Sequence, residues 1–509
     1  MTKKTKSIVS TTIVITILTI CFKLLGFVKQ MVVANFFGTG PEMDAYSVAF
    51  NFVGMLSSAF IRAITISMVS IYTNCLVNKG KEEASKIISA CLEILLPIVL
   101  GVLLLAYTLV PQIAYWAAPG YRSKPDQMAM VQQYLPMIFP FFLFSVVTLV
   151  WTTFMDANKD FVVSRTESFI TSVTTIICCV VLHSVHAVTS LIIAQYISYI
   201  VFGTMLLLRG RRYFKFKFVS IRSVPEIKII LYTAIPLFIG NSVSQINKLV
   251  DNALASGFDG GPASLTYAVS LEDFVTVILV NNVVDVLYVN FSIYTASKDY
   301  DKLVDVMKKA VNVMICIMIP ITIVTCLCSS EIVSIAFKRG MFNTGSVSTV
   351  RAALFGYAVG FASMGIRDII LRGLYSFKNT KTTMITGIIS VIVNIIFSIV
   401  LSRYIGIMGI TLASSISLTV NFLINSQMLK RHIPNYKITS HVPVLLKQLP
   451  GVIYTVAVVL VVKYFIPSTI MVFLLSAILG LGGYALILMF MKVEEVDYIK
   501  EKILAKVKR

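Results

Sequence analysis

The chain has 509 residues, of which 57% are hydrophobic and 13% charged, and its mean hydropathy is +0.86. Because about a quarter of the residues of soluble domains are charged, this composition excludes an ordinary soluble fold. A net charge of +20 is also typical of nucleic-acid-binding proteins. Here, however, lysine and arginine fall in alternate loops between apolar stretches. This distribution favours a membrane protein over a protein that binds nucleic acid.

Apolar stretches recur from end to end, and each is long enough to cross a bilayer, which takes about 20 residues. Together with the turn residues between them, they predict an all-α polytopic membrane protein with about fourteen transmembrane helices. The expected spans are 8–36, 44–74, 86–117, 127–155, 162–183, 187–209, 226–256, 263–296, 304–336, 346–377, 382–402, 405–429, 445–466 and 468–491.

The loop charges predict the orientation of the chain. The connection at 209–228 is the most basic, and further lysines lie near the N-terminus and in the tail. The intervening connections GTGPEM, HSVH and GFDGGPA carry no lysine or arginine. Basic loops stay on the cytoplasmic side, so both termini are expected there, in a bacterial cytoplasmic membrane.

The sequence also repeats at a fixed spacing. PEMDAY begins at Pro41 and PASLTY at Pro262, 221 residues later, and the same offset relates Asn158 to Asn379. This predicts two pseudo-repeated six-helix lobes, 1–220 and 221–435, followed by 436–509 with a C-terminal helix pair and a basic cytoplasmic tail. Internal repeats are typical of transporters, whose sites lie between the repeats.

Two lysines in the first span are the leading candidates for a binding site. Neither Lys23 nor Lys29 has an acidic residue within four positions, and a charged side chain inside a membrane is costly. Two uncompensated cations that face a cavity suit an anionic group such as a phosphate or pyrophosphate. The alternative is that Lys29 extends its ammonium to the membrane interface.

Other charges within the predicted spans allow two interpretations. Lys248 and Asp251 are three positions apart, and Asp368 and Arg372 are four apart, so each pair can neutralise itself on its own helix. Otherwise these side chains serve gating or ion coupling. The gating or ion-coupling candidates are Lys248, Asp251, Asp285, Arg367 and Asp368, and the other charges in predicted spans are Arg62, Glu93, Glu272, Asp273 and Arg372.

Enzyme and metal chemistry have little support in the sequence. The eight cysteines lie in or beside apolar segments, which is typical of buried thiols rather than zinc ligands or disulfides. The extracytoplasmic loops are mostly shorter than about ten residues and hold no paired carboxylates, unlike a membrane glycan polymerase or ligase. We expect a transporter without a metal or cofactor.

Three stretches resemble one known family. KLLGFVKQMVVANFFGTGPEMDAYSVAF from Lys23, AFKRGMFNTGSV from Ala336 and RGLYSFKNTKTT from Arg372 are similar, in this order, to segments of the MurJ/MviN-type lipid II flippases. The resemblance implies a V-shaped, two-lobed protein that works by alternating access. It also implies a cationic cavity for the pyrophosphate and sugars of an undecaprenyl-linked precursor, and a groove for its lipid tail along the last two helices.

The resemblance also suggests roles for single residues. Lys23 and Lys29 match cavity arginines of the family, Asp44 matches its acidic residue at the start of span 2, and Arg372 lies in its third motif. Asp44 and Arg372 are expected to latch or orient helices beside the substrate. The chain departs from the family at positions that are basic there, which here are Asn51, Ser57, Ser58 and Ser270; of these, Ser57 and Ser270 are retained as substrate-binding candidates.

The expected function is a flippase for an undecaprenyl-pyrophosphate-linked saccharide, with lipid II, the peptidoglycan precursor, as the leading substrate. Two alternatives stay open: a flippase for capsule, exopolysaccharide or teichoic-type intermediates, and a cation-coupled multidrug antiporter that uses Asp251 or Asp285. The energy source is also open between membrane potential and an ion gradient. The expected partners are the lipid-linked saccharide, the bilayer and cell-wall synthesis proteins.

Overall fold

The computed structural model describes residues 21–493 except 159, 212–216, 220–223 and 378. The described residues form helices and turns, with no strand among them. Packing divides the chain into two compact units. The first comprises Met1–Ala263 with Gly340–Phe342, and the second comprises Ser264–Arg339 with Asn343–Arg509.

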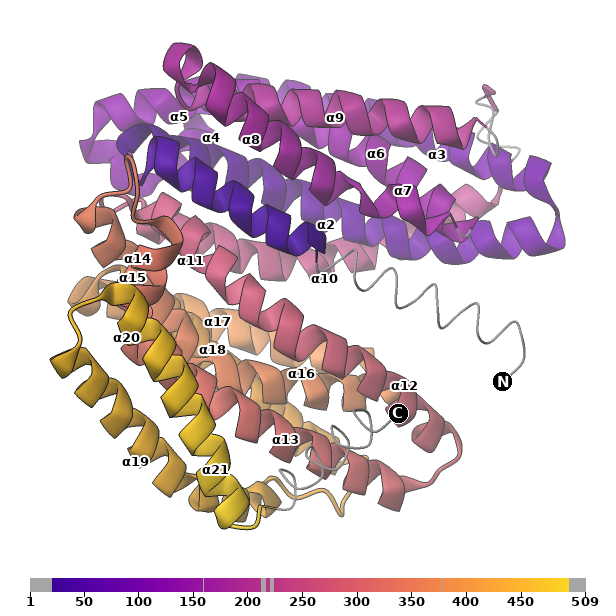
Figure 1. Ribbon diagram of the computed structural model, residues 1–509. Helices are drawn as coiled ribbons and strands as arrows, with labels where there is room; N and C mark the ends of the chain where they lie inside the picture. The colour runs from indigo at the N-terminus through magenta and orange to yellow at the C-terminus, as the bar shows by residue number, and fades with distance from the viewer. Residues whose placement is uncertain (1–20, 159, 212–216, 220–223, 378, 494–509) are drawn as a thin grey trace. The chain divides into compact units, whose positions relative to one another are not determined.

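The first unit is built around α2, which packs against α3, α5, α6 and α10. Proline stands in the first turn of α2, α5 and α6, where its missing N–H costs no intrahelical hydrogen bond. After a helix at 21–37, the elements are α2 (Pro41–Asn78), α3 (Lys81–Thr108), α4 (Val110–Ala117), η1 (Pro119–Ser123), α5 (Pro125–Ile138), α6 (Pro140–Ala157), α7 (Phe161–Arg165), α8 (Glu167–His186), α9 (Thr189–Gly210) and α10 (Glu226–Ala255) (Figure 1).

The second unit continues from the first turn of α11, and its helices α15 and α16 both pack on α13 and α18. Two of its segments, η3 and η5, are single π-helical turns within longer helices. Its elements are α11 (Gly261–Val275), η3 (Thr276–Asn281), α12 (Asn282–Ala296), α13 (Tyr300–Leu327), α14 (Ser329–Phe337), α15 (Thr344–Val359), α16 (Phe361–Ser376), α17 (Thr380–Ile405), α18 (Ile407–Lys430), η4 (Ile438–His441), α19 (Val442–Phe465), α20 (Thr469–Leu475), η5 (Ser476–Leu481) and α21 (Gly482–Phe490).

The prediction of an all-α polytopic membrane protein is confirmed. Within the described ranges, eleven helices are long and apolar enough to cross a membrane, or twelve if α15 and α16, bent by 43°, count as one span. The helix at 21–37 and α10 coincide with two further predicted spans but are not among the twelve. The predicted number of fourteen is therefore not confirmed.

The repeat seen in the sequence recurs in the helices. The starts of α2 and α11, α3 and α13, α4 and α14, α5 and α15, and α6 and α16 are each 219 to 221 residues apart. The boundary between the two compact units nevertheless follows Ala263 rather than residue 220, because α10 packs along α2.

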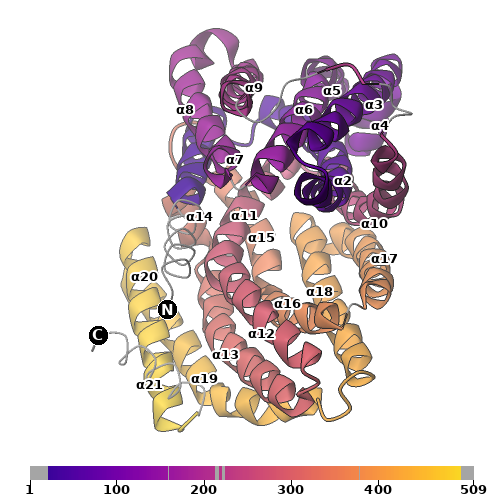
Figure 2. The same cartoon turned by 90° about the vertical axis from the view of Figure 1, so that its right-hand side faces the viewer.

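The C-terminal helices α19 and α21 lie side by side in the second unit, where α19 also packs on α13 (Figure 2). Polar contacts join α19 to α21 and to the preceding η5: the Tyr484 hydroxyl of α21 donates to Gln448 Oε1 at 2.5 Å, and the Thr455 hydroxyl is 3.3 Å from the Gly480 carbonyl oxygen of η5. Lys463 Nζ forms an ion pair with Glu331 at 2.9 Å. Because hydrocarbon offers no competing partners, such contacts hold membrane helices in register.

Candidate functional site

Lys23 and Lys29 lie on the helix at 21–37. Lys23 is exposed and Lys29 is partly buried, with Cys179 of α8 and Lys23 as its electrostatic neighbours. Among the ion pairs between described residues, none includes either lysine. Both cations are thus free to meet an anionic group.

Asp44, in the first turn of α2, is fully buried within the first unit. Its Oδ1 accepts a hydrogen bond at 2.9 Å from the backbone N–H of Ala263, the third residue of α11. The first N–H groups of a helix have no partner inside it and attract negative charge, so the carboxylate acts as a cap supplied by another helix. The second oxygen, Oδ2, has no hydrogen-bond partner among the described residues.

The short element η1 braces the turn that precedes α11. The backbone N–H of Gly120 donates to Ser256 Oγ at 2.9 Å, and Lys124 forms an ion pair with Asp259. A Cβ at Gly120 would lie 2.3 Å from the Gly257 nitrogen, so only glycine fits there. Tyr121 is buried, and this burial, with the nearby charge of Asp44, raises the pKa of its hydroxyl and keeps it neutral.

Two glycines allow the turns of two family-like motifs to approach each other closely. The backbone N–H of Met341 donates to the Asn35 carbonyl at 2.8 Å, which joins the KRGMF turn to the FFGTG turn within the first unit. Gly38 and Gly340 both have φ of +55°, a backbone conformation that favours glycine. A Cβ at Gly38 would lie 2.5 Å from the Met341 carbonyl oxygen, and one at Gly340 would lie 2.2 Å from that of Asn35.

The polar residues of α2 that replace basic positions of the family bond within the first unit. Asn51 Nδ2 donates to Asn252 Oδ1 on α10 at 3.1 Å. Ser57 and Ser58 donate to backbone carbonyls of their own helix, and both line a cavity of about 260 Å³. In the second unit, the Ser270 hydroxyl likewise donates to the Tyr267 carbonyl, at 2.6 Å.

The charges of α16 pair differently from the prediction. Arg372 NH2 lies 2.8 Å from Asp285 Oδ1 on α12, and its guanidinium lies over the ring of Tyr288, 5.4 Å from the centroid. Asp368 instead binds the neighbouring Arg367 at 2.6 Å. The pairing of Asp368 with Arg372, one of the two interpretations that the sequence allowed, is therefore not found. Arg367, the preceding residue in the chain, pairs with Asp368, whereas Arg372 reaches across to α12.

The remaining charged candidates have varied surroundings. Lys248 is exposed and Asp251 is buried, both on α10, whereas Glu272 is partly buried and Asp273 exposed on α11. The side chain of Arg62 lies outside the described part of the structure.

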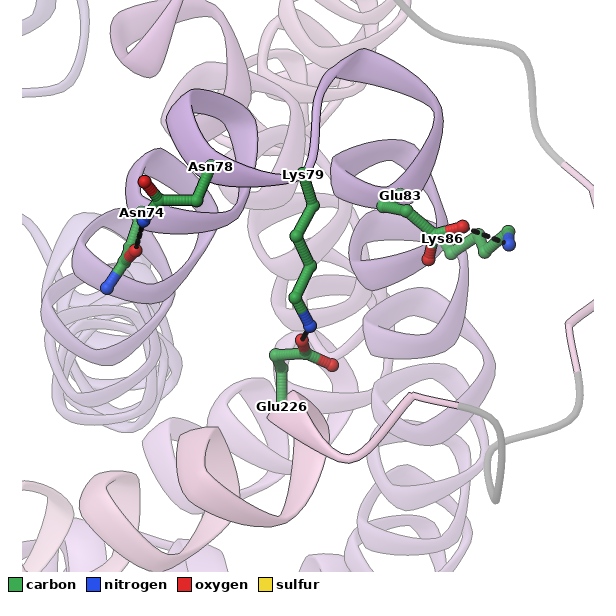
Figure 3. A network of polar contacts seen from close by, with 6 residues as sticks. All are labelled: Asn74, Asn78, Lys79, Glu83, Lys86 and Glu226. Carbon is green, nitrogen blue, oxygen red and sulfur yellow. Dashed lines mark hydrogen bonds and ion pairs between the residues drawn. The ribbon is translucent and has the colours of Figure 1, made fainter.

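One charged residue in a predicted span, Glu93, binds backbone rather than another charge. Its Oε1 accepts a hydrogen bond from the N–H of Val219 at 2.8 Å, which ties the basic connection to α3. At the same end of the unit, Lys79 pairs with Glu226 at 2.7 Å, and that hydrogen bond raises the pKa of the Lys79 ammonium (Figure 3). The Lys79–Glu226 pair holds the start of α10 against the α2–α3 turn.

No metal centre is apparent in the described ranges, where no group of three or more His, Cys, Asp and Glu side chains could hold a metal ion. All eight cysteines are free thiols, and Cys21 is exposed.

Sequence reasoning missed Gly120, Tyr121 and Ser256. The available signal was the glycine-rich turn before α11 and the single Gly120 in η1, because glycine permits a close approach of two backbones.

Comparisons with known proteins agree on one family. The family model for "Lipid II flippase MurJ" matches residues 33–491. The chain is 22% identical over 435 residues to the probable lipid II flippase MurJ of Rickettsia prowazekii (strain Madrid E). This alignment covers 82% of this chain and 83% of that protein. The chain is also 22% identical over 405 residues to the protein of the same name from Rhizobium tropici, which covers 78% and 76%.

Solved structures share the fold. A lipid II flippase MurJ in an inward closed conformation aligns with a TM-score of 0.81 and 23% identity, over 94% of this chain and 98% of that one. An inward-facing multidrug resistance transporter of the MATE family aligns with a TM-score of 0.68 and 16% identity, over 83% and 96%.

Proposed function

The chain belongs to the lipid II flippase MurJ family, and on that premise we propose that it moves lipid II from the inner to the outer leaflet of a bacterial cytoplasmic membrane. The apolar helices make it a multi-pass membrane protein. The basic alternate loops support a cytoplasmic location for both termini, which is part of the proposal. Transport of an intact lipid needs no covalent chemistry, so we expect no enzymatic activity and no cofactor.

The observation that carries the proposal is the pair of uncompensated lysines. A pyrophosphate loses its hydration when it leaves the membrane interface, and cationic donors replace the lost interactions. Lys23 and Lys29 have no carboxylate partner among the described residues, so their charges are not already neutralised. Lysine acts as a point charge without the planar fork of arginine, which suits attraction of a phosphate more than fixed orientation.

Asp44 and η1 supply the second element of the proposal. Alternating access requires helix ends that keep their arrangement on one side of the membrane while the other side opens. The cap from Asp44 to Ala263 and the brace from Gly120 to Ser256 order one turn at the predicted extracytoplasmic side. We assign Asp44 a role in orienting this turn rather than in contacting the substrate.

A second candidate substrate is another undecaprenyl-pyrophosphate-linked glycan. It is favoured by Asn51, Ser57 and Ser58, whose neutral side chains bond inside the first unit and offer no bidentate contact to an anion. A cation-coupled drug antiporter has less support, because Asp285 is paired with Arg372.

The test is complementation of a bacterium depleted of its own lipid II flippase, with outer-leaflet lipid II measured by a membrane-impermeant probe. Restored growth and restored exposure of lipid II support the proposal. A stable, membrane-inserted protein that exposes no lipid II would exclude that substrate. The same cells supplied with capsule or teichoic intermediates would then identify the second candidate.

A further inference from the structure

The first unit contains a cavity of about 260 Å³ whose walls come from α2, α5, α6 and α9. Its lining combines the aromatic rings of Phe50, Phe141 and Tyr199 with the hydroxyls of Ser57, Ser58 and Ser145. No lysine, arginine or carboxylate is among the lining residues.

The cavity lies deep along α2. Ser57 is sixteen residues after the helix start at Pro41, which corresponds to about 24 Å along the axis at about 1.5 Å per residue. The 38 residues of α2 exceed the length needed to cross a hydrocarbon core of about 30 Å, and the two serines lie near the middle of this helix.

The hydrogen bonds of the walls determine what the cavity offers. Ser57 donates to the Val53 carbonyl at 2.8 Å and Ser58 to the Met55 carbonyl at 3.0 Å, so each serine keeps an oxygen that accepts but has no proton to give. Ser145 and Tyr199 share one hydrogen bond of 2.7 Å, and the Tyr199 hydroxyl also has Gln195 of α9 as a hydrogen-bond partner. The walls thus present several hydroxyl oxygens that can accept hydrogen bonds, all of them neutral.

The rings provide apolar faces beside these hydroxyls. The ring centroid of Phe141 lies 5.7 Å from that of Tyr199 and 6.5 Å from that of Phe50. Aromatic faces carry partial negative charge, and the C–H groups of a sugar ring carry partial positive charge, so the two attract. Neutral hydroxyls next to aromatic faces match a polyhydroxylated ring better than an anion or a hydrocarbon chain.

We propose that this cavity receives one sugar ring of the lipid-linked saccharide, an inference that rests on the proposed function. Pockets for drug-sized ligands measure about 300–1,000 Å³, so a cavity of about 260 Å³ holds one ring with its substituents and not a whole headgroup. The tasks are then divided: Lys23 and Lys29 attract the pyrophosphate, and the neutral cavity binds the sugar.

Gly54 allows the cavity to be filled without disturbing the fold. It lines the cavity, and a Cβ at this position would meet no atom within 4 Å. Gly54→Leu therefore extends into open space. Gly101→Leu is the matched control, because a Cβ on this glycine of α3 also meets nothing within 4 Å and does not line the cavity.

The experiment measures binding of two probes to the purified full chain: lipid II and undecaprenyl pyrophosphate, which lacks the sugars. Gly54→Leu is expected to weaken lipid II binding at least about tenfold and to leave undecaprenyl pyrophosphate within about twofold. Gly101→Leu should change neither. Wild-type affinity of Gly54→Leu for lipid II would overturn the proposal. An equal loss for both probes would also overturn it, in favour of a lipid chain as the occupant.

A second variant tests the hydroxyls. Tyr199→Phe keeps the ring and removes one hydroxyl, so lipid II binding should fall about two- to twelvefold, the range for one neutral hydrogen bond. Tyr196→Phe is the control, because Tyr196 lies on the same helix α9, its hydroxyl donates to the Met137 carbonyl of α5, and it does not line the cavity. Equal losses for both tyrosine variants would contradict a sugar site.

The result also separates this inference from the proposed function. A third probe, undecaprenyl pyrophosphate with a single sugar, binds the same cavity if the inference holds. If wild-type protein neither binds nor exposes lipid II, but Gly54→Leu selectively loses the single-sugar lipid, the substrate assignment fails and the sugar cavity stands.

Discussion

Replacement of Gly340 by alanine should destabilise the first unit more than the same replacement of a glycine whose added Cβ would meet no neighbouring atom. The φ of +55° at this position costs a residue with a Cβ about 1–2 kcal/mol. The new Cβ would also lie 2.2 Å from the Asn35 carbonyl oxygen, so the turn must move and the hydrogen bond from Met341 N to that oxygen is strained or lost. One neutral hydrogen bond contributes about 0.5–1.5 kcal/mol, which brings the expected loss to about 1.5–3.5 kcal/mol.

The assay is thermal unfolding of the detergent-solubilised protein, followed by a dye that reacts with thiols as they become exposed. Buried free cysteines such as Cys75 and Cys91 report unfolding. A loss of about 1.5–3.5 kcal/mol corresponds to a decrease in Tm of roughly 3–14 °C. Gly203→Ala on α9 is the control, because its Cβ meets nothing within 4 Å and alanine favours a helix. If Gly340→Ala melts together with wild-type protein, the close approach of the two turns is refuted.

Two further substitutions test the polar contacts. Asp44→Asn keeps an oxygen for the N–H of Ala263, whereas Asp44→Ala leaves this buried N–H without its partner; alanine should cost about 1–3 kcal/mol and asparagine less, by the same melting assay. Equal losses would show that the charge, and not the hydrogen bond, stabilises the turn. Arg372→Gln and Asp285→Asn should each change the free energy of unfolding by no more than about 1 kcal/mol, because both side chains are partly exposed. Their double-mutant cycle should give a coupling in that range, and a coupling above about 2 kcal/mol would contradict a solvent-screened pair.

The sequence predicted the helices well because burial in a membrane requires long apolar stretches, which are visible without a structure. The spacing from Pro41 to Pro262 likewise predicted the repeat seen in the starts of α2 and α11. These are properties of continuous segments. They depend on the composition of each segment and on the spacing of the repeat, and not on which side chains contact one another in the fold.

Contacts across helices could not be predicted in the same way. Sequence spacing suggested a pair between Asp368 and Arg372, but Asp368 binds Arg367 and Arg372 reaches Asp285 on α12. The choice of partner depends on helix rotation and packing, which spacing on one helix does not contain.

The candidate site follows the same rule. Lys23 and Lys29 could be selected from the sequence, because the absence of nearby acids is a local property. The cap that Asp44 provides to Ala263 and the cavity lined by Ser57 required the packing of several helices.

The central claim is that the two lysines of the first span attract the pyrophosphate of lipid II. The most direct measurement is outer-leaflet lipid II in cells that depend on this protein, for the double variants Lys23→Gln/Lys29→Gln and Lys23→Arg/Lys29→Arg. Lys308→Gln, at an exposed lysine of α13, is the control for loss of positive charge. We predict that lipid II exposure is lost in the glutamine variant at normal protein levels and retained in the arginine variant and the control. Wild-type exposure in the glutamine variant would contradict the account.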